Sequence, residues 1–163
     1  MAKRWSKLKK EIESLFFEGI SLAVHCTDMR KAIESHKYNG GQHYSIQSIG
    51  VFKVVLGKRI IWNFPNDFID SENRETWPEQ RPYSYNVSIL NRIIRDYIDT
   101  PKNELFSKNF EQDVYGLTRL FLAADRRISI HKLKQYFIGI ENHAVKAILS
   151  ERTKSKTNLA DRS

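Results

Sequence analysis

The sequence has little cysteine, which cross-links small extracellular domains, and little proline or glycine, which interrupt regular structure. It contains one cysteine, four prolines and seven glycines in 163 residues. A single cysteine excludes a disulfide framework and a multi-cysteine zinc module, and so little glycine and proline excludes collagen-like and low-complexity classes. No apolar run approaches the roughly 18 residues of a membrane span, and the opening segment lacks the apolar core of a signal peptide. We therefore expect a globular, cytoplasmic protein without membrane contact.

The residues that are present suffice for a core. Hydrophobic residues make up 40% of the chain and aromatic residues 12%, which is too apolar for intrinsic disorder. A chain of this length buries roughly 70% of its unfolded surface without a metal or a disulfide. The sequence has no glycine-rich phosphate loop, Gly-x-Ser-x-Gly elbow or His-Glu-x-x-His pair. We therefore predict no cofactor, no metal and no catalytic residue. Whether the protein is an enzyme stays open at this point: a non-enzymatic role is favoured, and an enzyme would require a concave pocket that holds several ionisable groups with shifted pKa.

Positive charge is the strongest global feature. Lysine and arginine number 27 against 19 acidic residues, which gives a net charge of +8. The excess is concentrated at the ends, since residues 1–10 carry five cations and no acid, and residues 126–156 carry eight cations against two acids. Residues 65–80 are acidic instead. Two basic segments that meet on one surface would attract a polyanion, whereas the alternative is a solvated, solubilising surface.

The first half of the chain predicts a helix followed by strands. Residues 3–18 have the pattern of an amphipathic helix, which Gly19 ends. Its apolar face holds Trp5, Leu8, Ile12, Leu15 and Phe16. Residues 20–26 alternate as a half-buried strand and residues 42–49 form a second one. Residues 28–38 are ambiguous between a short helix and a loop.

A hairpin is predicted where residues 51–56 and 59–64 flank Gly57-Lys58. Glycine at the first central position of a two-residue loop suits a type II′ turn. With that turn, Val55 pairs with Ile60 and Lys53 pairs with Trp62. One face is then expected to hold Val51, Val55, Ile60, Trp62 and Phe64. Because these strands adjoin in the sequence, we predict an antiparallel sheet.

The stretch 65–83 holds three of the four prolines and shows no hydrophobic period. Such a length without regular structure is uncommon in a compact domain. It is either a functional flap or a variable insertion.

From residue 84 onward the pattern is helical. Ser84 or Asn86 can cap a first helix, which Thr100-Pro101 stops. Residues 112–124 form a second helix. Ser129 and Asn142 cap a third and a fourth.

These elements predict one domain. We expect an α+β fold over residues 1–152, with an amino-terminal helix, a small antiparallel sheet containing a β-hairpin, and an all-helical C-terminal half. Residues 153–163 lack hydrophobic periodicity and are predicted to form a disordered basic tail.

Two separated segments resemble a known family. The chain opens with Arg4-Trp5-Ser6-Lys7-Leu8-Lys9, and Ala124-Asp125-Arg126-Arg127-Ile128-Ser129 leads to Lys132-Leu133 and a closing helix that ends in Arg152. These segments resemble a family of small, uncharacterised bacterial proteins first described as a hypothetical protein of Shigella. Its members begin with a Trp-Ser-Lys-Leu-Lys helix and carry an Asp-Arg-Arg-Leu-Gly turn between two late helices. The likeness covers residues 4–18 and 87–152, with Ser129 where the family usually has glycine. It implies bacterial origin and a shared fold, and it implies no activity.

The turn Asp125-Arg126-Arg127 is the most specific candidate site. Asp125 lies at a helix end, where its charge opposes the helix dipole and therefore requires a partner. In one interpretation Asp125 accepts backbone N–H bonds at the next helix start or pairs with an arginine, and the turn fixes geometry. In the other, Arg126 and Arg127 grip a phosphate or a carboxylate.

The remaining candidates belong to the two basic ends. The amino-terminal cations could hold a nucleic-acid backbone while Trp5 stacks on a base, the alternative being that Trp5 docks its helix on the sheet. Residues 112–124 and 130–138 could form a helix-turn-helix whose second helix presents Lys132 and Lys134. An ordinary pair of antiparallel helices has the same pattern.

We therefore predict a non-enzymatic binding protein with a basic surface for an anionic partner, DNA or RNA first. The predicted nucleic-acid-binding residues are Lys3, Arg4, Lys7, Lys10, Arg126, Arg127, Lys132 and Lys134. Neutralisation of phosphates would supply the affinity. The alternative is a protein-interaction or regulatory accessory subunit that meets a protein partner through an apolar patch.

Overall fold

The computed structural model describes residues 5–34, 44–64, 67, 87–113 and 115–160. Within these ranges the chain has the predicted α+β arrangement, with an amino-terminal helix, a three-stranded antiparallel sheet and helices in the C-terminal half. Apart from Asp67, the acidic, proline-containing stretch predicted at 65–83 lies outside the described residues.

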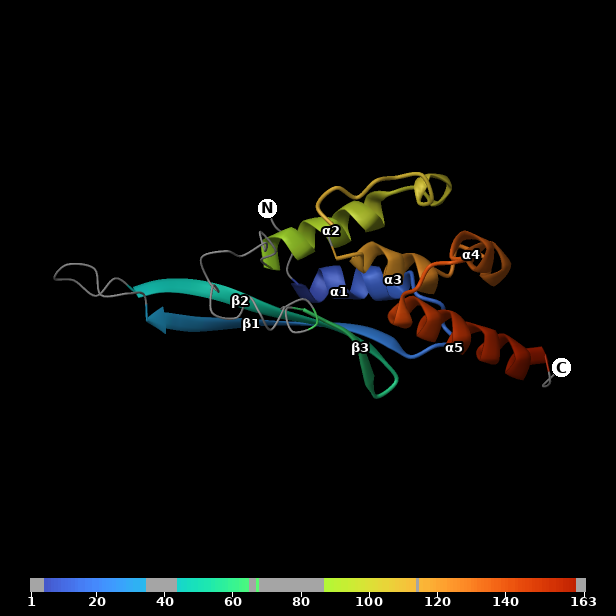
Figure 1. Ribbon diagram of the computed structural model, residues 1–163, viewed down its shortest axis with the longest axis horizontal. Coiled ribbons are helices and arrows are strands. Elements are labelled where there is room, and N and C mark those ends of the chain that lie inside the picture. Colours follow the sequence, from blue (N-terminus) through green and yellow to red (C-terminus); the bar gives the residue numbers. More distant parts are fainter. Residues whose placement is uncertain (1–4, 35–43, 65–66, 68–86, 114, 161–163) are drawn as a thin grey trace.

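The sheet consists of β1 (Leu22–Glu34), β2 (Tyr44–Leu56) and β3 (Arg59–Phe64), hydrogen-bonded in that order. β1 and β2 pair along their whole length, from Leu22 opposite Leu56 to Glu34 opposite Tyr44. The two strands form a long ribbon that extends past the helices (Figure 1). Among the described residues, the outer halves of β1 and β2 pair only with each other.

Two predictions about these strands are wrong. Residues 28–34, expected to be helix or loop, belong to β1, and the strands predicted separately at 42–49 and 51–56 are one strand. Gly50, which marks the expected break, pairs with Asp28 inside the ladder. Pairing with a neighbouring strand outweighs the local preferences of single residues, because strand propensity depends strongly on context.

The hairpin between β2 and β3 turns at Gly57-Lys58, as predicted. Gly57 has a φ of +63°, the sign that a type II′ turn requires at its first central position, and Val55 pairs with Ile60. The predicted pair of Lys53 with Trp62 is wrong, because the register shifts at Val54/Val55 and Trp62 lies opposite Val54. This irregularity is a β-bulge, in which two residues of one strand face one residue of the other.

The bulge decides which side chains of β3 enter the core. Trp62 and Phe64 are buried beside Phe52, whereas Ile60 is 47% exposed. A shift of one residue moves side chains to the opposite side of a strand. The prediction that one face of the hairpin holds Val51, Val55, Ile60, Trp62 and Phe64 is therefore wrong.

Helix α1 (Trp5–Ser14) packs against β1 through buried Leu8 and Ile12. The helix predicted at 3–18 ends at Ser14 because the following residues turn to pair with a later segment. Phe16 forms an antiparallel bridge with Asp125, and the Arg126 N–H donates to the Leu15 carbonyl at 2.8 Å.

Two side chains of α1 also cover the outer edge of β1. Lys9 Nζ donates to the Val24 carbonyl at 2.6 Å, and Glu13 Oε1 accepts from the Val24 N–H at 3.0 Å. Lys9 and Glu13 form a salt bridge with each other. Since β1 is an edge strand, these two backbone groups of Val24 are ones that a further strand would otherwise pair. The helix is thus hydrogen-bonded to the edge of the sheet as well as packed on it.

The C-terminal half comprises α2 (Val87–Asp99), the single-turn helix η3 (Lys102–Glu104), α3 (Leu117–Ala124), α4 (Ile130–Tyr136) and α5 (His143–Ala160). The stop at Thr100-Pro101 is confirmed. Both predicted caps are confirmed, since Ser129 Oγ accepts from the Lys132 N–H at 3.3 Å and Asn142 Oδ1 accepts from the Val145 N–H at 3.1 Å. Ser84 and Asn86 lie outside the described residues.

Helix α3 begins five residues later than predicted. Gly116 has a φ of +73°, a left-handed conformation that cannot continue a helix backwards. The Asp113 carboxylate accepts from the N–H groups of Leu117 and Thr118 at 2.9 and 2.7 Å. Asp113 therefore caps α3 from a turn instead of lying within it.

Helix α5 runs to Ala160, so the disordered tail predicted from residue 153 is wrong over 153–160. Extending an anchored helix adds one hydrogen bond for each residue fixed and needs no apolar stripe of its own. The helix also touches the amino-terminal half, because a Cβ placed at Gly19 would lie 2.1 Å from Ser155 Oγ.

The core lies between the sheet and the helices that gather on one side of it (Figure 1). Trp5 meets Phe52 edge-to-face, with ring centroids 5.7 Å apart, so Trp5 does dock α1 on the sheet. The fully buried side chains include Ile12, Val24, Phe52, Leu90, Ile94, Tyr97, Leu120, Phe121, Leu133 and Ile148.

Candidate functional site

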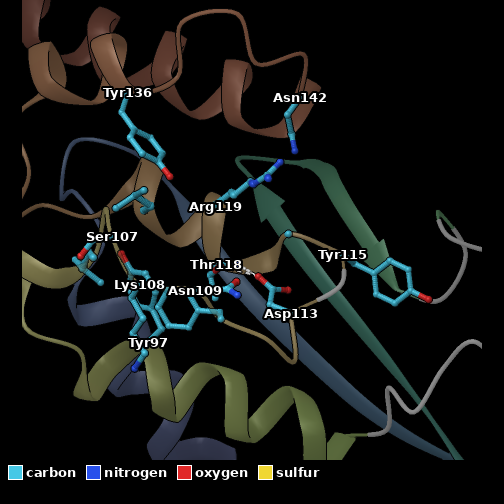
Figure 2. A pocket seen from close by; sticks show the side chains of 14 residues that line it. Tyr97, Ser107, Lys108, Asn109, Asp113, Tyr115, Thr118, Arg119, Tyr136 and Asn142 are labelled. Atoms are coloured by element: carbon cyan, nitrogen blue, oxygen red, sulfur yellow. Dashed lines mark hydrogen bonds between the residues drawn. The ribbon is translucent and has the colours of Figure 1, made fainter.

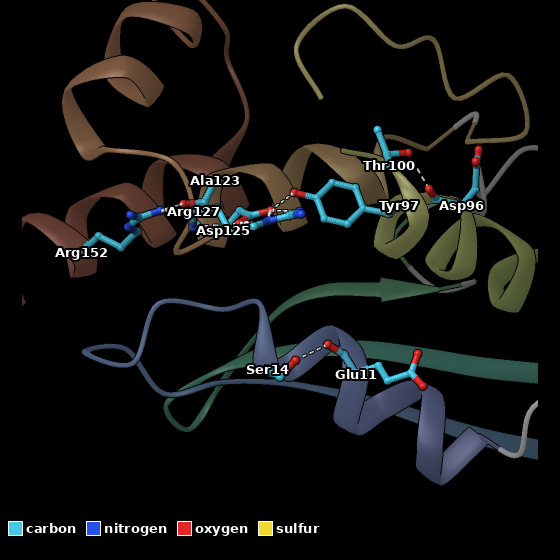
Figure 3. Close-up of polar contacts among 9 residues, drawn as sticks. All are labelled: Glu11, Ser14, Asp96, Tyr97, Thr100, Ala123, Asp125, Arg127 and Arg152. Atoms are coloured by element: carbon cyan, nitrogen blue, oxygen red, sulfur yellow. Dashed lines mark hydrogen bonds and ion pairs between the residues drawn. The ribbon is translucent and has the colours of Figure 1, made fainter. Parts of the chain in front are cut away.

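A buried carboxylate, Asp125, is the centre of the largest polar network in the described part of the chain. The Tyr97 hydroxyl donates to Asp125 Oδ2 at 2.8 Å, and Arg127 donates to the carboxylate from Nε at 2.9 Å and from Nη2 at 2.7 Å. The Arg127 backbone N–H adds a bond of 3.0 Å. Figure 3 shows Tyr97 reaching this turn from α2. A carboxylate with no exposed surface is thus fully hydrogen-bonded.

The electrostatics of the network are consistent with a fixed ion pair. Burial, reinforced by the Asp125 charge, raises the pKa of Tyr97 far above its usual range, so the phenol stays a neutral donor. The hydrogen bonds to Asp125 raise the pKa of Arg127, which stays cationic. The fork of Arg127 is matched to the carboxylate in the bidentate geometry that gives strong pairing.

Arg152 of α5 supports the same turn from the opposite side. Its Nη1 donates to the carbonyls of Ala123 and Asp125 at 2.9 and 3.1 Å, and its Nη2 donates to the Ile128 carbonyl at 2.9 Å. The guanidinium also lies 4.8 Å from the centre of the Phe17 ring. Burial lowers the pKa of Arg152, and the nearby Asp125 charge opposes that shift. Arg152 thus satisfies the Ala123 carbonyl near the end of α3 and bonds two carbonyls of the turn that follows.

Sequence reasoning found the turn and missed most of its partners. Asp125 pairs with an arginine, one of the two structural possibilities raised for it. The backbone N–H that it accepts is that of Arg127, within the turn, and not one at the start of α4. Tyr97 is not among the candidate residues that the sequence predicts. One general rule could have pointed to Tyr97: a buried tyrosine hydroxyl usually has a hydrogen-bond partner. No local pattern marks Arg152 as buried.

The predicted nucleic-acid-binding residues fall on three parts of the fold. Lys3 and Arg4 lie outside the described residues. Lys7 and Lys10 are exposed on α1. Lys132 and Lys134 are exposed on α4, with Lys132 Nζ 5.3 Å from the centre of the Phe106 ring. Helix α1 packs on α2 and β1, whereas α4 packs on α5. The cations of α1 and those of α4 therefore belong to helices with different packing partners.

The two arginines of the turn, Arg126 and Arg127, lie close to the end of α1. Arg126 is 52% exposed, and its Nη1 lies 3.9 Å from Glu18 Oε1. Phe17, Glu18, Arg126 and Arg127 together line a shallow hollow of about 480 Å³ at the end of α1. Arg127 contributes to this hollow while its Nε and Nη2 are engaged with Asp125. Arg126 is therefore the more available of the two arginines.

A separate polar pocket of about 430 Å³ lies between the 105–113 segment, α3 and the α4–α5 connection (Figure 2). Lys108, Asp113, Tyr115, Arg119, Tyr136 and Asn142 are among its lining residues. No sequence pattern indicates it, because its walls come from a loop and three helices that meet only in the folded chain. Arg119 in particular has no place in any motif of the sequence.

No protein-family model, curated protein or solved structure matches this chain. The resemblance to the Shigella family therefore stays a prediction. None of the helices in the described ranges combines the length and apolar composition that a membrane crossing requires. In the same ranges, no three histidine, cysteine, aspartate or glutamate side chains are grouped so that they could share an ion.

Proposed function

We propose that the protein binds a polyanion, nucleic acid first, through the α1 basic surface, defined as Lys7, Lys10 and Arg126. The proposal requires no chemical step and no cofactor. The observation that carries it is the internal use of the neighbouring acidic groups. In the described part of the chain Lys7 and Lys10 have no ion pair, and Arg126 has an exposed contact of 3.9 Å with Glu18.

Three acids that are close in sequence to these cations form their contacts elsewhere. Glu11 pairs with Arg95 of α2 at 2.8 Å. Glu13 is engaged with Lys9 and the edge of β1, and Asp125 with Arg127 and Tyr97. Glu18 lies 3.9 Å from Arg126, and an exposed pair at that distance contributes little.

The two lysines are spaced to act together. Lys7 and Lys10 are three residues apart on a helix, so their side chains leave the same side of α1. Exposed ammonium groups on one face neutralise successive phosphates of a backbone and release its counterions. The arginine beyond the end of α1 adds a planar donor suited to phosphate. This set reads charge and does not read base sequence. Lys3 and Arg4, which precede α1 in the chain, stay predicted members of the same surface.

The test is binding of the purified protein to labelled single- and double-stranded DNA and RNA over a salt series. Three phosphate contacts predict a log–log slope of about −2.7 on B-DNA. The variant K7E/K10E is expected to reduce the magnitude of that slope by about 1.8, since each phosphate contact contributes about 0.9. The control K58E/K102E makes the same change in net charge at two exposed lysines away from α1.

The control separates a local surface from overall charge. Equal loss in K7E/K10E and K58E/K102E would show that net charge alone drives binding and would refute the assignment to α1. No binding by the unmodified protein at low salt would remove the proposal, leave the cations as solubilising surface, and direct the search to a protein partner.

A further inference from the structure

The polar pocket holds two charged side chains whose interactions are internal. Lys108 Nζ donates to Asp96 Oδ1 and to Thr100 Oγ1, at 2.5 and 2.9 Å, which ties the 105–113 segment to the end of α2. Asp113 accepts from the backbone of α3 and from the Thr118 hydroxyl at 2.6 Å. Both groups stabilise the walls of the pocket, and the single carboxylate that lines it is committed to the cap of α3.

Three donor groups of the same pocket have no such commitment. The Arg119 guanidinium makes no hydrogen bond or ion pair with the described residues, and the hydroxyl of Tyr136 likewise has no partner among them. Asn142 uses Oδ1 to cap α5, which turns its amide nitrogen away from the helix end. Figure 2 shows Arg119 extending toward Asn142, with the Tyr136 hydroxyl pointing toward the Arg119 side chain. The unused groups are thus donors, and one of them carries a positive charge.

Aromatic side chains shape two separate sides of the pocket (Figure 2). Tyr136 is held edge-on against Phe106 and Phe137, at centroid distances of 4.8 and 5.0 Å. Tyr115 lies beside Phe64 at 5.8 Å. Rings fixed by neighbouring rings offer apolar contact without losing much side-chain freedom on binding. A pocket of this volume is in the range that encloses small ligands.

We infer that this pocket binds a small organic anion that carries a ring, with its phosphate or carboxylate group held by Arg119, Tyr136 and Asn142. The fork of Arg119 suits either acid group, because both present two oxygens in a plane to paired N–H donors. The ring then lies against Tyr136, whose own ring is held by Phe106 and Phe137. This site is separate from the α1 basic surface and does not depend on it.

The test is calorimetric titration, with the Arg119 Nε–H signal followed by NMR. The probes are adenosine 5′-monophosphate and phenyl phosphate for the phosphate group, and phenylacetate for the carboxylate. Adenosine supplies the same ring without charge. At least one anionic probe is expected to bind and to shift the Arg119 signal, and its affinity is expected to fall about ten- to a hundredfold in R119M. Which anion binds distinguishes a phosphomonoester ligand from a carboxylate.

Matched variants keep the result interpretable. R92M removes an exposed arginine of α2 that does not line the pocket and is expected to bind the probe as the unmodified protein does. Arg119 is exposed, so R119M is expected to keep the melting temperature, and Y136F offers a second, smaller loss of affinity. The inference is overturned if adenosine binds as well as its monophosphate, if R92M and R119M lose affinity equally, or if none of the three anions shifts the Arg119 signal.

Discussion

The substitution Asp125→Asn tests whether the buried network holds the α3–α4 turn together. The amide keeps the shape of the carboxylate and can still accept a bond, but it loses the charge that Arg127 pairs with and turns an N–H₂ group toward a donor. Three side-chain bonds of 2.7 to 2.9 Å reach the carboxylate from Tyr97 and Arg127. No part of Asp125 is exposed, so water cannot replace them.

The expected cost follows from these contacts. Breaking a buried ion pair by removing one partner costs about 3–5 kcal/mol. The Arg127 side chain is 25% exposed and can turn partly into water, which lowers the expected loss to about 2–4 kcal/mol. For a chain of this size that is a fall in melting temperature of about 5–15 °C. Urea denaturation should show a lower midpoint with an unchanged slope.

Asp99→Asn is the matched control. Asp99 is 63% exposed and lies 3.6 Å from Arg95, so its loss should cost under about 1 kcal/mol. In a double-mutant cycle, Asp125→Asn and Arg127→Met should couple by about 1–3 kcal/mol, as residues of one network do. A cost for Asp125→Asn no larger than that of Asp99→Asn, or additive effects in the cycle, would refute the reasoning.

Three further predictions concern stability. Above the ordinary tyrosine pKa of 10.0, the folded chain keeps the Tyr97 proton, whereas the unfolded chain releases it. The free energy of unfolding should therefore fall by up to about 1.4 kcal/mol for each pH unit above about 10. Urea denaturation at successive pH values should show this dependence in the unmodified protein and not in Tyr97→Phe. Trp62→Ala should cost about 3–5 kcal/mol and Ile60→Ala under about 1 kcal/mol; equal costs would contradict the bulged register. Gly19→Ala should cost about 1–3 kcal/mol in thermal denaturation, because its Cβ meets Ser155, and adding Ser155→Gly should recover part of that loss; full stability of the single variant would count against the close approach.

Local chemistry predicted the helix boundaries that depend on neighbouring residues. Ser129 and Asn142 cap helices as expected, because a cap is a contact between residues three apart. The turn at Gly57 was equally accessible, since its conformation is a property of glycine itself. These features need no knowledge of the rest of the fold.

The errors share a different cause. The bulge opposite Val54 depends on how Trp62 and Phe64 reach the core, which neither strand encodes alone. The continuation of β1 to Glu34 depends on pairing with a segment that starts at Tyr44. Strand order and register are properties of pairs of segments, so single-segment periodicity cannot supply them.

The candidate sites divide in the same way. The turn at Asp125 was predicted because a carboxylate at a helix end needs a partner, and a neighbouring arginine supplies one. Its other contacts come from Tyr97 and Arg152, which are 28 and 27 residues away along the chain. The donors of the polar pocket are similarly dispersed, so only the folded chain brings Arg119 and Asn142 to one wall.

Two side chains of α1 bond the backbone N–H and carbonyl of Val24, the groups that a neighbouring strand would pair. Lys9 supplies a donor and Glu13 an acceptor to one residue of β1, the same two bonds that a fourth strand would make there. Another chain that approached this edge would find the position already taken, and would have to displace an ion pair before it could add to the sheet. The Lys9–Glu13 pair therefore has two effects. It keeps the Glu13 carboxylate away from Lys7 and Lys10, and it blocks self-association at the edge of the sheet where α1 contacts Val24.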